Sequence, residues 1–189
     1  MEIGHLFVIT GPSGVGKSTI VREVVRQTDA FYSVSATTRK SRPGEIDGRD
    51  YLFVDRPTFE KMIADGQLLE WAEIFGDYYG TPKKPVSEAM SAGKTVILEI
   101  DIEGGRQVHR AMPDATFIFI GPPDEDELKR RLSGRGTESP DTIERRFARA
   151  KEEICIAAGN GIYNHRIVND NLDTAIREVV DLIKEQTQK

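Results

Sequence analysis

The sequence predicts an α/β fold in which a parallel sheet carries helices on both faces. Short apolar runs alternate with longer segments of helical periodicity along most of the chain. Parallel strands need crossover connections, and the helices that make these crossovers cover both faces of the sheet. The runs expected to form strands of this sheet are residues 6–9, 95–100, 116–120 and 166–168.

The predicted helices are placed by apolar spacing and by residues that start or stop a helix. Apolar residues within 20–25 share one helical face after a glycine-rich loop. Two further helices begin at prolines and stop before Gly66 and Gly93. Asn171 or Asp173 is expected to cap the last helix. Beyond the first segment, the expected helices cover residues 57–65, 85–92, 125–132, 140–158 and 174–186.

The bulk composition fits one soluble domain of 189 residues with a net charge of −5. A chain without a global basic field is not expected to bind nucleic acid or an anionic membrane. No apolar run is long enough to span a bilayer, and no signal-peptide pattern opens the sequence, so we expect a cytoplasmic protein. Cys155 is the only cysteine, which excludes an intrachain disulfide, and its apolar surroundings predict a core residue.

Two polar segments interrupt the α/β core. Residues 33–82 contain strand-like pieces, a helical pattern and a hairpin signal at Gly76-Asp77, so we expect a small, antiparallel α+β insert. Residues 124–150 carry too much charge for core helices, and we expect a helical lid there. Such inserts suggest parts that close over substrates. The single domain is thus divided into a core of residues 1–32, 83–123 and 151–189, the insert and the lid.

The strongest local motif is a phosphate-binding loop that matches G-x-x-x-x-G-K-[ST] over residues 11–18. Its glycines let backbone N–H groups approach phosphate oxygens, and the following helix points its positive end at the anion. Lys17 can bridge the β- and γ-phosphates of ATP, and Ser18 can bind Mg²⁺. The motif predicts a P-loop NTPase-type sheet. Its ATP-binding residues are Gly11, Pro12, Ser13, Gly14, Val15, Gly16, Lys17, Ser18 and Thr19.

A carboxylate is also needed to hold the metal from the side opposite the loop. The apolar run 96–100 ends at Asp101, at the carboxyl edge of a predicted strand, where ligands of parallel sheets bind. We therefore assign Asp101 to Mg²⁺, either directly or through water. Glu99 lies on the same face by the two-residue period of a strand and is the competing candidate.

The phosphate loop alone does not identify the acceptor of a phosphoryl group. Arg39, Arg42 and Tyr51 lie in a basic segment, residues 35–51, and are suitable donors for a monophosphate. Taken alone, such a basic segment is more often a solvated surface than a binding site. A second basic concentration lies in residues 129–151, where eight Lys and Arg residues oppose three acidic residues. On an acidic protein, this concentration of basic residues suggests that an anion binds there. A solvated, salt-bridged helix face explains some of these residues.

Further motifs are spread along the chain in addition to the loop. They are residues 33–39, 42–45, Gly48, 50–51, Glu70, 79–81, 98–101, 131–132, 135–137, Arg146 and 168–170. By these motifs and residues 11–19 the chain resembles the guanylate kinase family along nearly its whole length. It departs from the family pattern at residues 103–105 and 164–166, neither of which is a proposed substrate contact.

The resemblance implies a role for each matching residue. It implies that Glu70 reads guanine, whose N1–H and exocyclic amine both suit one carboxylate. Acceptor-site residues implied in the same way are Ser35, Arg39, Arg42, Tyr51, Tyr79, Thr81 and Asp101, and donor-site residues are Arg131, Arg135, Arg146 and Asn169. Lys17, Arg39, Arg135, Arg146 and Asp101 are the expected catalytic residues.

The implied reaction is direct in-line transfer from Mg-ATP to GMP, and to dGMP, in purine metabolism. ATP and GMP are the expected partners of a monomer or homodimer. Two alternatives stay open. A non-catalytic guanylate-kinase-like domain that binds phosphopeptides would be expected to lose the loop or the lid arginines, yet Lys17, Ser18, Arg135 and Arg146 are present. A sugar-phosphate kinase should not need Ser35, Glu70 and Thr81 together.

Overall fold

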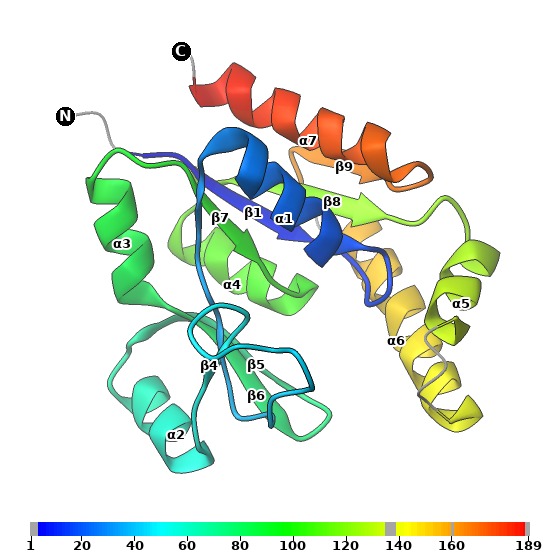
Figure 1. The fold of residues 1–189 in the computed structure, drawn as a ribbon, viewed down its shortest axis with the longest axis horizontal. Coiled ribbons are helices and arrows are strands. Elements are labelled where there is room, and N and C mark those ends of the chain that lie inside the picture. Colours follow the sequence, from blue (N-terminus) through cyan, green and yellow to red (C-terminus); the bar gives the residue numbers. More distant parts are fainter. Residues whose placement is uncertain (1–3, 135–138, 160, 188–189) are drawn as a thin grey trace.

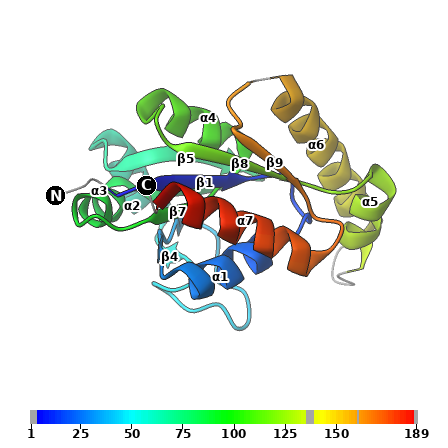
Figure 2. The same ribbon diagram turned by 90° about the horizontal axis from the view of Figure 1, so that it is seen from above.

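The computed structural model describes residues 4–134, 139–159 and 161–187. Its core is a five-stranded parallel sheet in the order β2-β7-β1-β8-β9, with helices on both faces (Figures 1 and 2), so the predicted fold class is confirmed. The strands are β1 (Leu6–Thr10), β2 (Phe31–Tyr32), β7 (Val96–Glu99), β8 (Thr116–Gly121) and β9 (His165–Val168). The short strand β2 was not predicted, because two residues show no period.

The side-chain alternation along β1 explains why helices cover both faces. Phe7 and Ile9 pack with α1 (Lys17–Thr28) and α7 (Leu172–Thr187), whereas Leu6 and Val8 pack with α3 (Lys83–Ser91) and α4 (Ile102–Ala111). Every residue of β1 is buried. Figure 2 shows this central strand between the two helical layers. Asn171 accepts a hydrogen bond from the Thr174 backbone and caps α7, as one of the two candidates predicted.

Helix α4 was not predicted from the sequence. Gly104 and Gly105 lie in its first turn, and two adjacent glycines are unfavourable in an isolated helix. Tertiary contacts replace the missing propensity, because both glycines are buried and Asp101 caps the helix by accepting from the Gly104 N–H at 2.7 Å.

The insert forms a second sheet in the order β4-β3-β6-β5 beside helix α2 (Arg56–Ala64). Its strands are β3 (Ala36–Thr37), β4 (Leu52–Phe53), β5 (Leu68–Ile74) and β6 (Asp77–Pro82). The β5–β6 hairpin is confirmed, but its turn residues are Phe75 and Gly76, one residue earlier than predicted. The sheet is antiparallel except where β3 and β4 pair in parallel.

The predicted lid consists of α5 (Glu125–Ser133) and the first half of α6 (Pro140–Gly159). Leu128 and Leu132 are buried and pack with Ala150 of α6. Figure 1 shows these helices and the insert projecting from the core in different directions. Because α6 is continuous across residue 150, the predicted boundary of the lid lies inside a helix. Cys155, on the same helix, is exposed, so its prediction as a core residue was wrong.

None of the helices in the described ranges has the length and apolar character needed to cross a membrane.

Candidate active site

The phosphate loop connects β1 to α1 and has the backbone conformation that its glycines permit. Gly14 and Gly16 have φ values of 87° and 96°, in the left-handed region that other residues rarely adopt. The Lys17 Nζ atom donates to the carbonyl oxygens of Gly11 and Pro12, at 2.5 and 3.0 Å. The loop therefore holds its lysine folded back over its own backbone, where a phosphate chain would lie in a P-loop protein.

The two candidate carboxylates at the end of β7 face different partners. Glu99 accepts a 2.5 Å hydrogen bond from the Ser18 hydroxyl of the phosphate loop. Asp101 instead caps α4 and accepts from Arg149 at 3.3 Å. Of the two carboxylates, Glu99 is thus the one that contacts the hydroxyl predicted to bind Mg²⁺, whereas Asp101 is engaged by α4 and Arg149.

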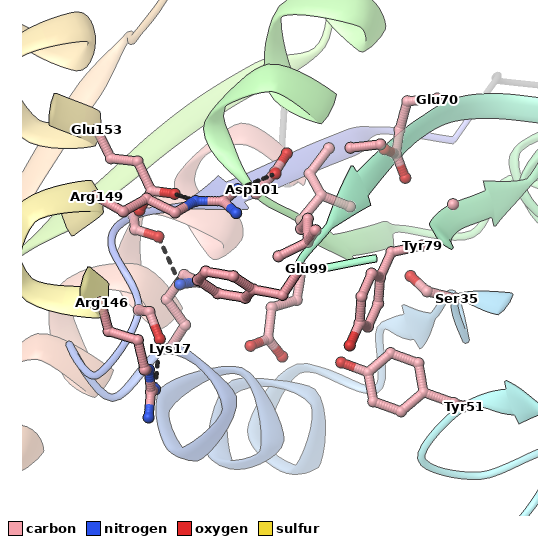
Figure 3. Close-up of a pocket in the computed structure, with 17 residues that line it drawn as sticks. Lys17, Ser35, Tyr51, Glu70, Tyr79, Glu99, Asp101, Arg146, Arg149 and Glu153 are labelled. Carbon is pink, nitrogen blue, oxygen red and sulfur yellow. Dashed lines mark hydrogen bonds and ion pairs between the residues drawn. The ribbon is translucent and has the colours of Figure 1, made fainter. Parts of the chain in front are cut away.

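A cavity of about 250 Å³ joins the phosphate loop to the insert. In Figure 3, Lys17 and Arg146 lie on one side of Glu99, and Glu70 and Tyr79 lie on the other. The lining also includes Gly11, Ser13, Ser35, Tyr51, Asp101, Arg149 and Glu153. Residues predicted from motifs up to 135 positions apart in the sequence therefore meet around one space.

Glu70 is the most deeply buried acid of this cavity, with 5% of its surface exposed. Its Oε1 atom accepts a 2.6 Å hydrogen bond from the hydroxyl of Thr81, which is fully buried on β6. Burial, with a further contribution from the negative charge of Asp101, raises the pKa of Glu70 to about 7, and the Thr81 bond opposes the shift. Its carboxylate lies in the lining of the cavity, so this acid can accept hydrogen bonds from a ligand there.

The basic segment of the insert is organised around Glu45. Arg39 forms a two-pronged ion pair with Glu45, with its closer nitrogen at 2.8 Å, and the Arg42 backbone N–H donates to the same carboxylate. Tyr51 lies edge-on to the ring of Tyr79 and beneath the Arg39 guanidinium. Burial raises the pKa of Tyr51 to about 12, so its hydroxyl stays a donor.

Arg39, Arg42, Glu45 and Tyr51 line a second cavity of about 890 Å³, which extends toward α1. Ser18 and Glu99 line this cavity beside the phosphate loop. Residues of the insert line its other side, among them Arg39, Arg42 and Tyr51. Two arginines and a tyrosine hydroxyl thus lie near the phosphate loop. Such hydrogen-bond donors suit the binding of a monophosphate group.

The lid arginines contact the phosphate loop directly. Arg146 donates to the Ser13 hydroxyl at 2.7 Å, and Arg131 pairs with Glu127 at 2.6 Å with one nitrogen 3.5 Å from the Val15 carbonyl oxygen. Asn169 is buried and donates to the same carbonyl at 2.8 Å. Arg135, a predicted catalytic and ATP-binding residue, lies outside the described residues.

Sequence reasoning assigned no role to several residues that line the cavity, including Arg149, Glu153 and Phe75. Arg149 donates to Asp101 and to Glu153, at 3.3 and 2.9 Å, and lies 5.4 Å from the centre of the Phe75 ring. The signal was present, because Arg149 follows Arg146 by three residues and precedes Glu153 by four, so all three share one helical face. Phe75 had no such signal, since it enters the site from a hairpin turn.

The donor set at the loop fits a divalent cation that is shared with a nucleotide. Within the described ranges, no three His, Cys, Asp or Glu residues gather as a protein-only metal site. Ser18 and Glu99 supply hard oxygen donors beside the lysine, which suits Mg²⁺ held partly by phosphate oxygens.

The parallel sheet, the phosphate loop at the end of β1 and the basic lid define a P-loop phosphotransferase of the small-kinase type. A gluconokinase from Sinorhizobium meliloti, 14% identical with a TM-score of 0.53 over 100% of this chain and 96% of that one, shares the fold. The guanylate kinase family model matches residues 4–186. The chain belongs to the guanylate kinase family.

Individual relatives agree with the family model. A guanylate kinase from Carboxydothermus hydrogenoformans is 51% identical over 95% of this chain and 87% of its own length. One from Gloeobacter violaceus is 50% identical over 97% and 89%, respectively. The crystal structure of a guanylate kinase from Anaplasma phagocytophilum is 30% identical and superposes with a TM-score of 0.82 over 100% of this chain and 88% of that one.

Proposed function

We propose that the chain transfers the γ-phosphoryl group of ATP to GMP, and also to dGMP, to give ADP and the nucleoside diphosphate. The observation that carries the acceptor assignment is the buried carboxylate of Glu70, which faces the same cavity as Lys17. The names of the relatives support the same reaction.

Guanine suits this carboxylate because it presents two adjacent donors, N1–H and the exocyclic amine. Ionised Glu70 accepts from both, and Asp101 beside it offers further acceptor capacity. Adenine has no donor at N1 and would leave a buried carboxylate oxygen unpaired, which is the more costly form of discrimination. Ser35 lies in the same wall, and Thr81 holds Glu70 in place.

The acceptor phosphate is held by Arg39, Arg42, Tyr51 and Tyr79, which approach from the insert. Lys17 and Arg146 stabilise the negative charge that moves between the two nucleotides, and positioning supplies most of the remaining rate. Mg²⁺ would neutralise ATP phosphate charge when bound beside Ser18 and Glu99. We assign this metal role to Glu99 in place of Asp101, because only Glu99 contacts the Ser18 hydroxyl.

The division into core, insert and lid, the cytoplasmic location and a monomeric or homodimeric state remain predictions. The insert and the lid would close over both nucleotides and exclude water, which suppresses hydrolysis of ATP. By the family resemblance, Arg135 remains a predicted ATP-binding and catalytic residue.

A panel of acceptors tests the reaction. Purified protein with Mg-ATP would be given GMP, dGMP, AMP, dTMP, UMP and ribose phosphates, and ADP formation would be followed in a coupled assay. We expect turnover with GMP and dGMP only. Binding of GMP without formation of GDP would support the phosphopeptide-binding alternative, and preference for a ribose phosphate would support the sugar-phosphate kinase.

A further inference from the structure

The first turn of α4 lies against the carboxylate of Glu70 at Gly104. Its backbone N–H donates to Asp101 Oδ1 at 2.7 Å and so fixes the orientation of that carboxylate. On its other side, Gly104 faces the carboxylate of Glu70. One glycine is therefore close to two acids of the pocket, Glu70 and Asp101.

A side chain at this position would collide with Glu70. A Cβ atom built on Gly104 would lie 2.5 Å from Glu70 Oε2 and 3.1 Å from Glu70 Cδ, and also 3.3 Å from Asp101 Oδ1. The first of these distances is well inside van der Waals contact, so one of the two groups would have to move.

The helix is not free to move away from β5. One turn after Gly104, the side chain of Gln107 accepts from the Trp71 N–H at 3.1 Å and donates to the Trp71 carbonyl at 2.8 Å. Trp71 is the residue next to Glu70, so this pair of bonds clamps α4 to the strand that carries the acid. The Glu70 side chain would give way instead, although its other oxygen is held by Thr81.

We propose that Gly104 is a positioning residue for the acceptor base: its N–H aligns Asp101, and its missing side chain leaves the space in which Glu70 aims at guanine. The inference rests on the proposed function, because it assumes that Glu70 and Asp101 face a purine with hydrogen-bond donors on its edge. Gly104 touches neither the base nor the reacting atoms and acts only through the two carboxylates.

The variant Gly104→Ala tests this role, and Gly105→Ala is its matched control. Both changes add one methyl group to a buried glycine of the same helix and raise its helix propensity equally. The methyl group at 105 would instead face Thr10 Cγ2, at 3.0 Å on β1. We expect Gly104→Ala to raise KM for GMP by ~10-fold or more, because small displacements of positioning groups are costly. KM for ATP and the unfolding temperature should match those of the control.

A merely structural role for Gly104 would not raise KM for GMP while leaving KM for ATP unchanged. If KM for GMP were the same in Gly104→Ala and Gly105→Ala, the proposal would be overturned. A wild-type protein that does not phosphorylate GMP would instead overturn the proposed function, so the two failures are distinguishable.

Shortening the acid provides a second test. In Glu70→Asp the carboxylate is one methylene shorter, so the methyl group added at 104 has room. We expect Gly104→Ala to raise KM for GMP much less in the Glu70→Asp background than in the wild-type background, and equal increases would contradict the steric link. If Gly104→Ala alone did not fold, the double variant should fold, and its failure to do so would also overturn the proposal.

Discussion

The donor and acceptor halves of the site are built in opposite ways. The phosphate loop is one continuous segment, in which glycines, lysine and serine act through local backbone geometry. The acceptor half is assembled from residues of β5 and β6 together with Ser35 before β3, Tyr51 before β4 and Asp101 before α4, which meet only in the folded chain. In the proposed function, the first half binds a feature common to nucleoside triphosphates, whereas the second recognises one base through a single buried acid.

Replacing Lys17 should have the largest effect and should fall on the donor half alone. In Lys17→Met the cation beside the phosphate chain is lost, and we expect kcat to fall by about 10²–10³-fold, as when other transition-state charge partners are removed. Steady-state kinetics with saturating nucleotides would measure this fall. Equilibrium binding of GMP should stay unchanged, and a parallel loss of GMP binding would contradict the separation of the halves.

Glu70→Gln should weaken the binding of GMP in the acceptor half and leave the donor half unchanged. The amide would set a donor against a guanine donor inside a buried pocket, and we expect KM for GMP to rise by about 10- to 100-fold. Glu73→Gln is a matched control on the same strand, because Glu73 is exposed. Initial rates with each nucleotide varied in turn would separate the effects, and an unaltered KM for GMP in Glu70→Gln would remove the guanine assignment.

The raised pKa of Glu70 predicts an opposite response of binding and stability to pH. Only the ionised acid accepts from both guanine donors, so kcat/KM for GMP should fall as the pH falls through about 7, approaching ~10-fold per unit below it. The contribution of Glu70 to folding has the reverse sign. It is fully present below the ordinary pKa of 4.5 and is lost as the pH rises through about 7.

Matched pH profiles of kcat/KM and of urea unfolding would measure both responses. Glu70→Gln should flatten the part of each profile that lies between these two pKa values. A wild-type kcat/KM that stays constant from pH 8 to about pH 5 would contradict a titrating acid at the base.

Arg149→Gln should have the smallest effect and tests a link between the halves. Arg149 joins α6 to Asp101, but its side chain is 32% exposed, so solvent weakens the ion pair. We expect KM for GMP to rise by about two- to fivefold with little change in kcat. Arg145→Gln, at an exposed position of the same helix, should leave KM unaltered. Equal kinetics for the two variants would mean that Arg149 does not orient Asp101.

The same contrast explains which parts of the molecule could be predicted. The phosphate loop and the strand before it could be predicted from the local sequence, because each of their residues acts on its sequence neighbours. Glu70 has no local signal between two apolar residues, and only resemblance to a family identified it. The choice between Glu99 and Asp101 needed the Ser18 contact, since the two-residue period places both on one face.

Tertiary contacts also account for the elements that the sequence did not indicate. Gly104 and Gly105 argue against a helix locally, yet α4 forms because both glycines are buried and Asp101 caps its first turn. Cys155 shows the reverse error: an apolar sequence neighbourhood predicted burial, but the residue lies on the outer face of α6. Neither the formation of α4 nor the exposure of Cys155 can be predicted from the residues of a single helical turn.

The claim that the donor and acceptor halves bind their nucleotides independently is tested most directly by measuring the binding of both nucleotides to a variant of each half. The dissociation constants of GMP and of Mg-ATP would be measured by calorimetry for the wild-type protein, Lys17→Met and Glu70→Gln. We predict that Glu70→Gln weakens GMP binding and spares ATP, while Lys17→Met weakens ATP binding and spares GMP. Wild-type affinity for GMP in Glu70→Gln, or an equal loss of both nucleotides in either variant, would contradict it.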